Sequence, residues 1–184
     1  NVGGTREAIR LACRGRAKPL HHVSTIGVLP FTALGDVEVV REDDPLPPPD
    51  GLLGGYEQGK WVAERLVREA AARGLPVTIH RPGRVAGSAT TGRSNADDLA
   101  SRVFLGCVRM GAVPDLPGTL DVTPVDYCAA ALVHLALHGP ADGRTYHLVN
   151  PARPRMQDAY DVAESRGHPV RRLPWPQWHA AFVE

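Results

Sequence analysis

YEQGKWVAERLV, residues 56–67, follows a proline-rich loop, and its apolar spacing predicts the opening turns of a helix. Tyr56 and Lys60 are four residues apart, so a helix places both side chains on one face, one turn from each other. A phenol normally loses its proton near pH ~10, and a neighbouring ammonium group favours the phenolate. Such a pair can pass a proton to a carbonyl oxygen near neutral pH. The alternative is an exposed helix start with a solvated lysine.

Helical and strand patterns alternate along the rest of the chain, separated by glycine and proline. This alternation is typical of an α/β fold with a doubly wound parallel sheet. Asn1 and Asp126 precede two predicted helices and are expected to cap them. We expect helices at 4–15, 56–73, 97–111, 127–138 and 156–166, and strands at 20–26, 76–80, 145–149 and 170–173.

Two hydroxyl side chains end the first predicted strand. Ser24 and Thr25 follow an apolar run and precede Gly27, where the strand gives way to a loop. In open α/β sheets, ligands bind outside the carboxyl ends of the strands, so both hydroxyls stand where chemistry would occur. The alternative role for either is a turn hydrogen bond.

The composition is that of an ordinary globular protein. A net charge of +1 and a hydrophobic content of 43% indicate neither a nucleic-acid footprint nor an acidic tail. No apolar run approaches the ~18 residues of a membrane helix, and the first residues lack the apolar core of a signal peptide. Three cysteines without metal-type spacing indicate reduced thiols, so we expect a cytoplasmic protein. From the charge and the lack of a long apolar run, we expect neither nucleic-acid nor membrane partners.

Two further motifs each lack a residue that their chemistry requires. GGYEQGK at 54–60 matches most of a phosphate-binding P-loop, but Trp61 stands where that loop needs serine or threonine. His134 and His138 share a predicted helix face, but Leu135 stands where the zinc metalloprotease helix has glutamate. We therefore expect neither nucleoside triphosphate binding nor a metal site.

Together these pieces resemble the extended short-chain dehydrogenase/reductase family. They are most similar to the thioester reductase domains that terminate nonribosomal peptide and polyketide synthetases, a module shared with carboxylic acid reductases and male-sterility-type fatty acyl reductases. The resemblance covers nearly the whole chain and rests on motifs in a fixed order and spacing. The matching runs are NVGGTRE at 1–7, HVSTIGV at 22–28, GYEQGKWVAE at 55–64, HRPGRVAG at 80–87 and PVDY at 124–127.

The resemblance implies a catalytic triad of Thr25, Tyr56 and Lys60. Thr25 and Tyr56 would stabilise and protonate a carbonyl oxygen as it becomes negative. NADPH would supply the hydride, and the substrate would be an acyl or peptidyl thioester on a phosphopantetheinyl carrier protein, reduced to an aldehyde or alcohol. The residues expected to contact the cofactor are Ser24, Tyr56, Lys60, Pro82, Gly83 and Val85.

The resemblance also implies a division of the chain into two regions. Residues 1–90, with 121–150 returning to them, would form part of an NADP-binding Rossmann-like domain, namely the C-terminal half of its sheet. Residues 91–120 and 151–184 would form part of a smaller substrate-binding region.

The sequence departs from the family pattern in two places. No glycine-rich phosphate loop follows a strand, so we expect an N-terminally truncated domain that by itself binds NADPH poorly. Gly59 replaces the usual serine and lowers the helix propensity between Tyr56 and Lys60 by roughly 1 kcal/mol relative to alanine. The alternatives are a sugar-nucleotide epimerase or dehydratase of the same superfamily and a catalytically inert fragment.

Overall fold

The structure, a computed structural model, describes residues 1–30 and 39–183. The chain divides into two compact units. Unit 1 comprises Asn1–Val85 and Asp126–Val149, and unit 2 comprises Ala86–Val125 and Asn150–Glu184. The resemblance implies boundaries near residues 90, 121 and 150, and the division into a cofactor-binding and a substrate-binding region remains a prediction. Part of the loop expected before Tyr56, residues 31–38, lies outside the described residues.

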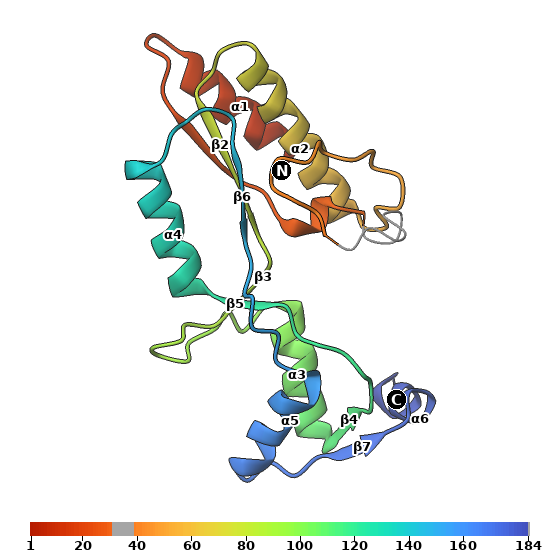
Figure 1. Ribbon diagram of the computed structural model, residues 1–184. Coiled ribbons are helices and arrows are strands. Elements are labelled where there is room, and N and C mark those ends of the chain that lie inside the picture. Colours follow the sequence, from red (N-terminus) through yellow and green to blue (C-terminus); the bar gives the residue numbers. More distant parts are fainter. Residues whose placement is uncertain (31–38, 184) are drawn as a thin grey trace. The chain divides into compact units, whose positions relative to one another are not determined.

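A parallel sheet forms the centre of unit 1, as Figure 1 shows. Its strands are β1 (Leu20–Val23), β2 (Val77–Pro82) and β6 (Thr145–Leu148), in the order β1-β2-β6. Every residue of β2 is buried, as expected for the middle strand of a sheet with both faces covered. The α/β fold with a parallel sheet is therefore confirmed.

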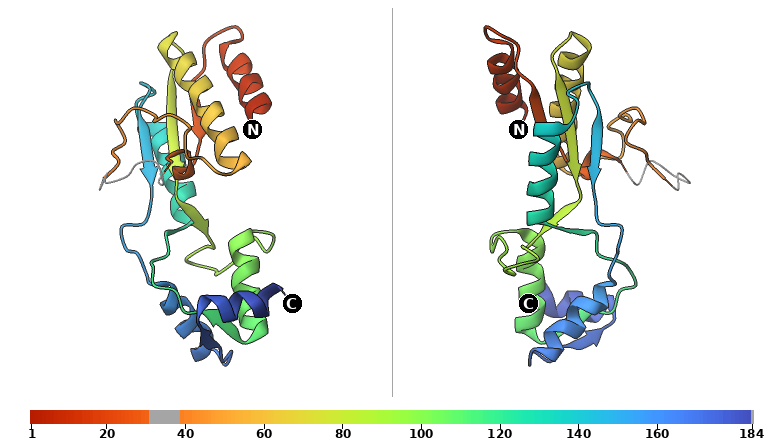
Figure 2. Two further views of the ribbon diagram at one scale, coloured as in Figure 1. Left: turned by 90° about the vertical axis from the view of Figure 1, so that its right-hand side faces the viewer. Right: turned by 60° about the vertical axis from the view of Figure 1, so that its left-hand side comes forward.

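Helices cover both faces of this sheet. Figure 2 shows α1 (Val2–Cys13) and α2 (Gly55–Ala72) on one face and α4 (Val125–His138) on the other. The first two helices pack on the sheet through a buried apolar cluster. Full burial of such a valine or isoleucine side chain contributes roughly 1.5–3 kcal/mol. The cluster consists of Ala12, Val67, Leu75, Val77 and Ile79.

The strand register places the carboxyl ends of the strands at one edge. Val23 pairs with His80, so β2 continues two residues beyond the end of β1, to Pro82. Pro82 in turn pairs with Leu148, the last residue of β6. This edge carries Ser24, Thr25 and Gly83 directly after the strands, which is where a parallel sheet binds ligands.

Unit 2 has a core of its own. It contains α3 (Leu99–Met110), β4 (Ala112–Pro114), β5 (Val122–Pro124), α5 (Met156–Ser165), β7 (Arg171–Leu173) and α6 (Trp175–Val183), and β3 (Arg84–Ala86) lies at its boundary with unit 1. Strands β4 and β7 pair in parallel. The buried side chains of the core are Cys107, Val113, Tyr160, Val170 and Trp178.

Three local predictions differ from the structure. The first strand ends at Val23 rather than at residue 26, because Ile26–Val28 forms a 3-10 turn whose N-cap is Thr25. Helix α4 follows β5 directly and begins at Val125, so Asp126 lies in its first turn and is not the N-cap. Asn1 occupies the N-cap position of α1, but its side chain makes no capping hydrogen bond.

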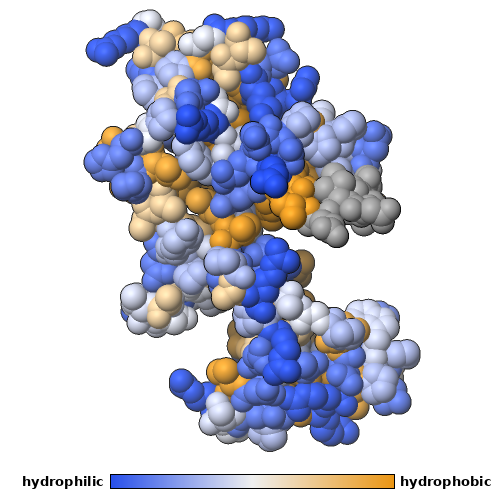
Figure 3. Space-filling view, viewed as in Figure 1, coloured by the Kyte–Doolittle hydropathy of each residue, from blue (hydrophilic) through white to orange (hydrophobic). Residues whose placement is uncertain are grey.

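The surface alternates between polar and apolar areas, which Figure 3 shows from one side. Several large apolar side chains of unit 1 are exposed, including those of Val23, Leu53 and Tyr56 near the carboxyl edge of the sheet or at the start of α2. Among the described residues, no helix is both long and apolar enough to cross a membrane.

Candidate active site

Lys60 connects the predicted helix motif to the end of the first strand. Its Nζ donates a hydrogen bond to the carbonyl oxygen of Val23, at 3.0 Å. Val23 is the last residue of β1 and lies two residues before Thr25. The structure therefore brings the ammonium group of α2 to the strand end that carries the predicted hydroxyl. An ammonium group has three hydrogens, so this contact leaves two for another ligand.

Thr25 is held in place by the turn that follows it. It is the N-cap of the 3-10 turn Ile26–Val28, and its Oγ1 accepts a hydrogen bond from the Gly27 amide at 3.2 Å. This turn bond is the alternative role that the sequence suggested for the residue. It uses an oxygen lone pair and leaves the hydroxyl hydrogen able to donate to a substrate oxygen.

Tyr56 stands in the first turn of α2, one turn before Lys60. Its side chain is 56% exposed, so the phenol is accessible. The helix places Tyr56 and Lys60 on one face, as their spacing predicts. Convergence of Thr25, Tyr56 and Lys60 on one substrate oxygen remains a prediction.

The side chain of Ser24 is committed to a buried carboxylate. Ser24 is only 2% exposed, and its Oγ donates to Oε2 of Glu64 at 2.7 Å. Its amide continues the sheet by donating to the carbonyl oxygen of His80 at 2.7 Å. The cofactor contact expected at Ser24 remains a prediction, and it would have to leave this hydroxyl bond in place or replace it.

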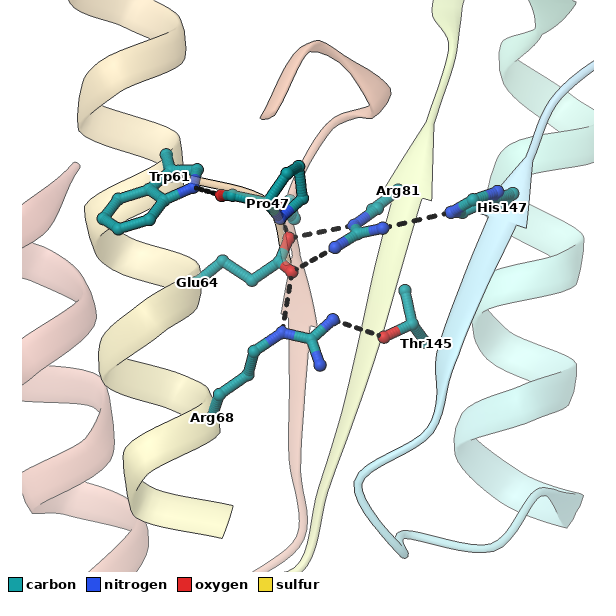
Figure 4. Close-up of polar contacts among 8 residues, drawn as sticks. Pro47, Trp61, Glu64, Arg68, Arg81, Thr145 and His147 are labelled. Carbon is teal, nitrogen blue, oxygen red and sulfur yellow. Dashed lines mark hydrogen bonds and ion pairs between the residues drawn. The ribbon is translucent and has the colours of Figure 1, made fainter. Parts of the chain in front are cut away.

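Glu64 is the centre of a buried network of charged groups (Figure 4). Arg81 of β2 donates to both carboxylate oxygens, with Nη2 at 2.6 Å from Oε1 and Nε at 3.1 Å from Oε2. The side chains of Glu64 and Arg81 are 0% and 1% exposed. Arg68 adds a third donor, with Nε at 3.0 Å from Oε1. Such forked contacts are among the strongest hydrogen bonds in proteins.

The network also reaches the third strand. Arg68 donates from Nη2 to Oγ1 of Thr145 at 2.9 Å, and Nη1 of Arg81 lies 3.2 Å from Nε2 of His147. Both partners belong to β6. The Glu64 carboxylate is therefore bonded to the end of β1 and to β2, and through the two arginines it is linked to β6.

The charges of the network determine the protonation of its members. Burial by itself raises the pKa of Glu64, but the hydrogen bonds and charge of Arg81, with smaller contributions from Ser24 and Arg68, lower this pKa overall. Burial and the nearby Arg81 charge lower the pKa of His147. Glu64 is thus an anion in the folded protein at neutral pH, stabilised by two guanidinium groups.

His22 belongs to β1, and burial strongly affects its pKa. Burial, and then the charge of Lys60, lower the pKa of His22 to about 4. Its Nε2 is buried and lacks a hydrogen-bond partner. Because the imidazole of His22 is neutral at neutral pH, it adds no second positive charge to that of Lys60.

The remaining predicted cofactor residues lie at the end of β2 or just after it. Pro82 is buried as the last residue of that strand, and the amide of Gly83 donates to the carbonyl oxygen of Leu148 at 3.0 Å. Val85 lies in β3 and is 41% exposed. Pro82 and Gly83 are therefore fixed by the sheet at the same edge as Thr25.

A cavity of about 740 Å³ lies in unit 1. It is lined by Asp142, Gly143, Arg144 and other residues around the start of β6, including Thr145 and His147 of the charged network. Ligands of parallel sheets bind at the carboxyl ends of strands, so we place the candidate active site at the strand ends and not in this cavity.

The buried ion pair of Glu64 and Arg81 was not predicted from the sequence. One signal was present in the helix pattern, namely a charged residue on the buried face of α2. Glu64 falls on the same face as Val67, where a buried residue is expected to be apolar. It lies one turn from Lys60 and one turn from Arg68. Its partners could not be identified, because Arg81 is 17 residues away and Ser24 is 40 residues away in the sequence.

Comparison with known proteins places this geometry in a family. Residues 1–132 match the NAD-binding family described as male sterility protein. The chain is 45% identical over 182 residues to the isonitrile lipopeptide synthase of Streptomyces coeruleorubidus, covering 98% of this chain and 12% of that protein. It is 38% identical over 184 residues to a component of the linear gramicidin synthase of Brevibacillus parabrevis, covering 100% of this chain and 4% of that protein.

A solved structure shares the fold closely. The terminal R domain from the myxalamid PKS-NRPS biosynthetic pathway superposes with a TM-score of 0.90 at 54% identity, covering 97% of this chain and 44% of that domain's chain. The chain therefore spans less than half the length of each of these three relatives. The family match covers most of the chain and includes Thr25, Tyr56, Lys60 and the buried pair of Glu64 and Arg81. This chain accordingly belongs to the male sterility protein family of NAD-binding domains.

Proposed function

We propose that this chain forms the catalytic part of an NADPH-dependent reductase that acts on carrier-bound acyl or peptidyl thioesters. The observation that carries the proposal is the hydrogen bond from Lys60 to the end of β1, because it brings the Tyr-x-x-x-Lys helix to the strand end that bears Thr25. Family membership supports a nicotinamide cofactor, and the similar synthases support a carrier-bound substrate.

The donors present at the strand ends fit the nicotinamide end of such a cofactor. Lys60 retains two ammonium hydrogens that could bind ribose hydroxyls. Pro82 and Gly83, held by β2 and β6, could line the nicotinamide, with Val85 and Tyr56 as further contacts. When bound, the cofactor would supply a hydride to the thioester carbonyl carbon.

The protein's own groups would manage the charge that develops on the carbonyl oxygen. The Thr25 hydroxyl donates a hydrogen bond to that oxygen, and the Tyr56 phenol donates the proton. The charge of Lys60 favours the phenolate that remains on Tyr56. The resulting hemithioacetal collapses to an aldehyde and releases the thiol of the carrier. A second reduction of the aldehyde would give an alcohol.

The second unit is proposed to hold the substrate. Unit 2 has its own core and follows β3, next in sequence to the residues proposed to line the nicotinamide. Its proposed partner is a phosphopantetheinyl carrier protein, whose flexible arm would deliver the thioester to Thr25 and Tyr56.

The test uses the natural protein that contains this chain. It is incubated with an acyl thioester on a phosphopantetheinyl carrier protein and either NADPH or NADH, and nicotinamide oxidation and aldehyde formation are measured. We expect stoichiometric oxidation of NADPH and release of the carrier thiol, with a Tyr56→Phe variant nearly inactive. Conversion of a nucleotide sugar, with no reaction of the thioester, would instead favour an epimerase or dehydratase.

A further inference from the structure

The carboxylate of Glu64 joins the three chain segments that carry the proposed active site. It lies four residues after Lys60 on α2, accepts from Ser24 next to Thr25, and pairs with Arg81 next to Pro82. Each of these contacts is between 2.6 and 3.1 Å, and the carboxylate is fully buried. Figure 4 shows Glu64 pointing from α2 toward β2, between the two arginines.

This arrangement does more than neutralise charge. Arg81 alone would pair with Glu64 through two hydrogen bonds, yet the carboxylate also accepts from Ser24, whose neighbour is the proposed oxygen-binding hydroxyl. A short side chain with a buried hydrogen bond has little freedom, so the position of the Thr25 backbone depends on that of Glu64. Lys60 binds the same strand end from the preceding turn of α2, at the carbonyl oxygen of Val23.

We propose that Glu64 is a positioning residue for the proposed reduction, and that Ser24 is the link through which it sets the position of Thr25. The inference rests on the proposed function. On this basis, the hydroxyl of Ser24 serves the site by bonding to Glu64 and does not need to touch the cofactor. Loss of that single bond lets the end of β1 move, which misplaces Thr25 while the ion pair of Glu64 and Arg81 persists.

The chain offers a matched control at the other end of the network. Thr145 is 6% exposed and, like Ser24, has a hydroxyl that makes one hydrogen bond within the network, with Nη2 of Arg68. It lies at the start of β6, whereas Ser24 follows the carboxyl end of β1. Ser24→Ala and Thr145→Val therefore each remove one hydroxyl hydrogen bond of the network, and only the first removes it next to Thr25 in the sequence.

The first experiment measures hydride transfer in the natural protein during a single turnover, with enzyme in excess over carrier-bound thioester and NADPH saturating. When the enzyme concentration also saturates the carrier-bound substrate, the observed rate constant does not depend on the fraction of enzyme that is folded. We expect Ser24→Ala to slow it by about ten-fold or more, since small misplacements at a reacting centre have large effects. We expect Thr145→Val to change it by less than about two-fold, and the steady-state KM for NADPH to stay within about two-fold in both variants.

The second experiment needs no catalysis. Hydrogen–deuterium exchange is measured on the peptide that covers residues 20–30, which contains the amides of Ser24 and of the turn after Thr25. We expect Ser24→Ala to speed exchange in this peptide and Thr145→Val to leave it unchanged. The two variants are expected to lower Tm by similar amounts.

The outcomes separate the inference from the proposed function. Equal slowing by both variants, or no slowing by Ser24→Ala in an active enzyme, overturns the positioning role. A raised KM for NADPH with unchanged hydride transfer in Ser24→Ala assigns Ser24 to the cofactor and overturns the link. If the wild-type protein does not reduce thioesters, the proposed function fails. The exchange experiment then decides alone whether Ser24 holds the end of β1.

Discussion

The ammonium group of Lys60 donates a hydrogen bond to the carbonyl oxygen of Val23, which ties the second helix of unit 1 to the end of its first strand. The two residues are 37 positions apart in the sequence. The contact places a positive charge at the end of β1, two residues before Thr25, and Tyr56, one turn earlier on the helix, is exposed. Substitutions of Tyr56 and of Lys60 can separate the role of the phenol from that of the ammonium group.

Tyr56→Phe should remove most turnover of the natural protein and leave the affinity for NADPH nearly unchanged. The phenol is the proposed proton donor, and loss of such a donor typically costs about 10²–10⁴-fold in rate. Steady-state kinetics and a cofactor fluorescence titration measure the two effects. A variant with near-normal kcat would show that another group supplies the proton.

Lys60→Ala should lower both kcat and NADPH affinity, because it removes the charge near the phenol and the proposed ribose contact together. Lys18→Ala is the matched control, since Lys18 is the only other lysine and binds backbone carbonyl oxygens just after α1. The same kinetic and titration measurements apply to both variants. Equal effects of the two substitutions would contradict a specific role for Lys60.

Glu64→Ala should destabilise the protein far more than loss of an exposed glutamate on the same helix. It leaves Arg81 buried without its carboxylate, and breaking such a buried pair typically costs about 3–5 kcal/mol. Glu69→Ala removes an exposed pair with Arg65 at 3.6 Å and should cost at most about 0.5 kcal/mol. Urea unfolding gives both free energies, and similar values would show that the buried pair contributes little.

Stability should fall as the pH is lowered from about 6.5 to about 4 through protonation of His22. The folded protein lowers the pKa of this group from 6.5 to about 4, so the unfolded chain binds more protons in that window. The stability contributed by the neutral His22 is complete above the pKa that this group has in the unfolded chain, 6.5. It is lost as the pH falls toward the pKa in the folded protein, about 4. This contribution to the free energy of unfolding is roughly 3 kcal/mol, because a difference of one pKa unit corresponds to about 1.4 kcal/mol.

Substitution of the titrating group tests this dependence. His22→Leu should flatten the change in unfolding free energy between about pH 6.5 and pH 4, whereas His138→Gln, at an exposed position on α4, should not. Urea unfolding across this pH range measures both variants. An unchanged slope in His22→Leu would assign the acid sensitivity to other groups, such as His80 and His147, whose pKa values burial also lowers.

The three thiols should react at very different rates with a maleimide. Cys13 is exposed, whereas Cys107 and Cys128 are buried, and burial raises the pKa of both buried thiols. We expect labelling at Cys13 alone under native conditions and labelling at all three in denaturant, as detected by peptide mass spectrometry. Rapid native labelling of Cys107 would contradict the packing of the unit 2 core.

The sequence by itself determined the local features. Hydrophobic periodicity located α2, and the spacing of Tyr56 and Lys60 placed both on one helix face, because a helix repeats every 3.6 residues. The alternation of helix and strand patterns predicted the parallel sheet and hence the edge at which Ser24 and Thr25 lie. Errors arose at element ends such as Thr25 and Asp126, where one hydrogen bond or one preceding strand decides the boundary.

Only the tertiary structure decided which distant groups meet. Ser24, Glu64 and Arg81 come from a strand end, a helix and a second strand, and none of their contacts follows from local spacing. A buried carboxylate is stable only where enough donors surround it, and those donors are assembled by packing of whole elements. The sequence could therefore place the three residues of the predicted triad on their elements. The carboxylate of Glu64, which is bonded to several of these elements, became visible only in the folded chain.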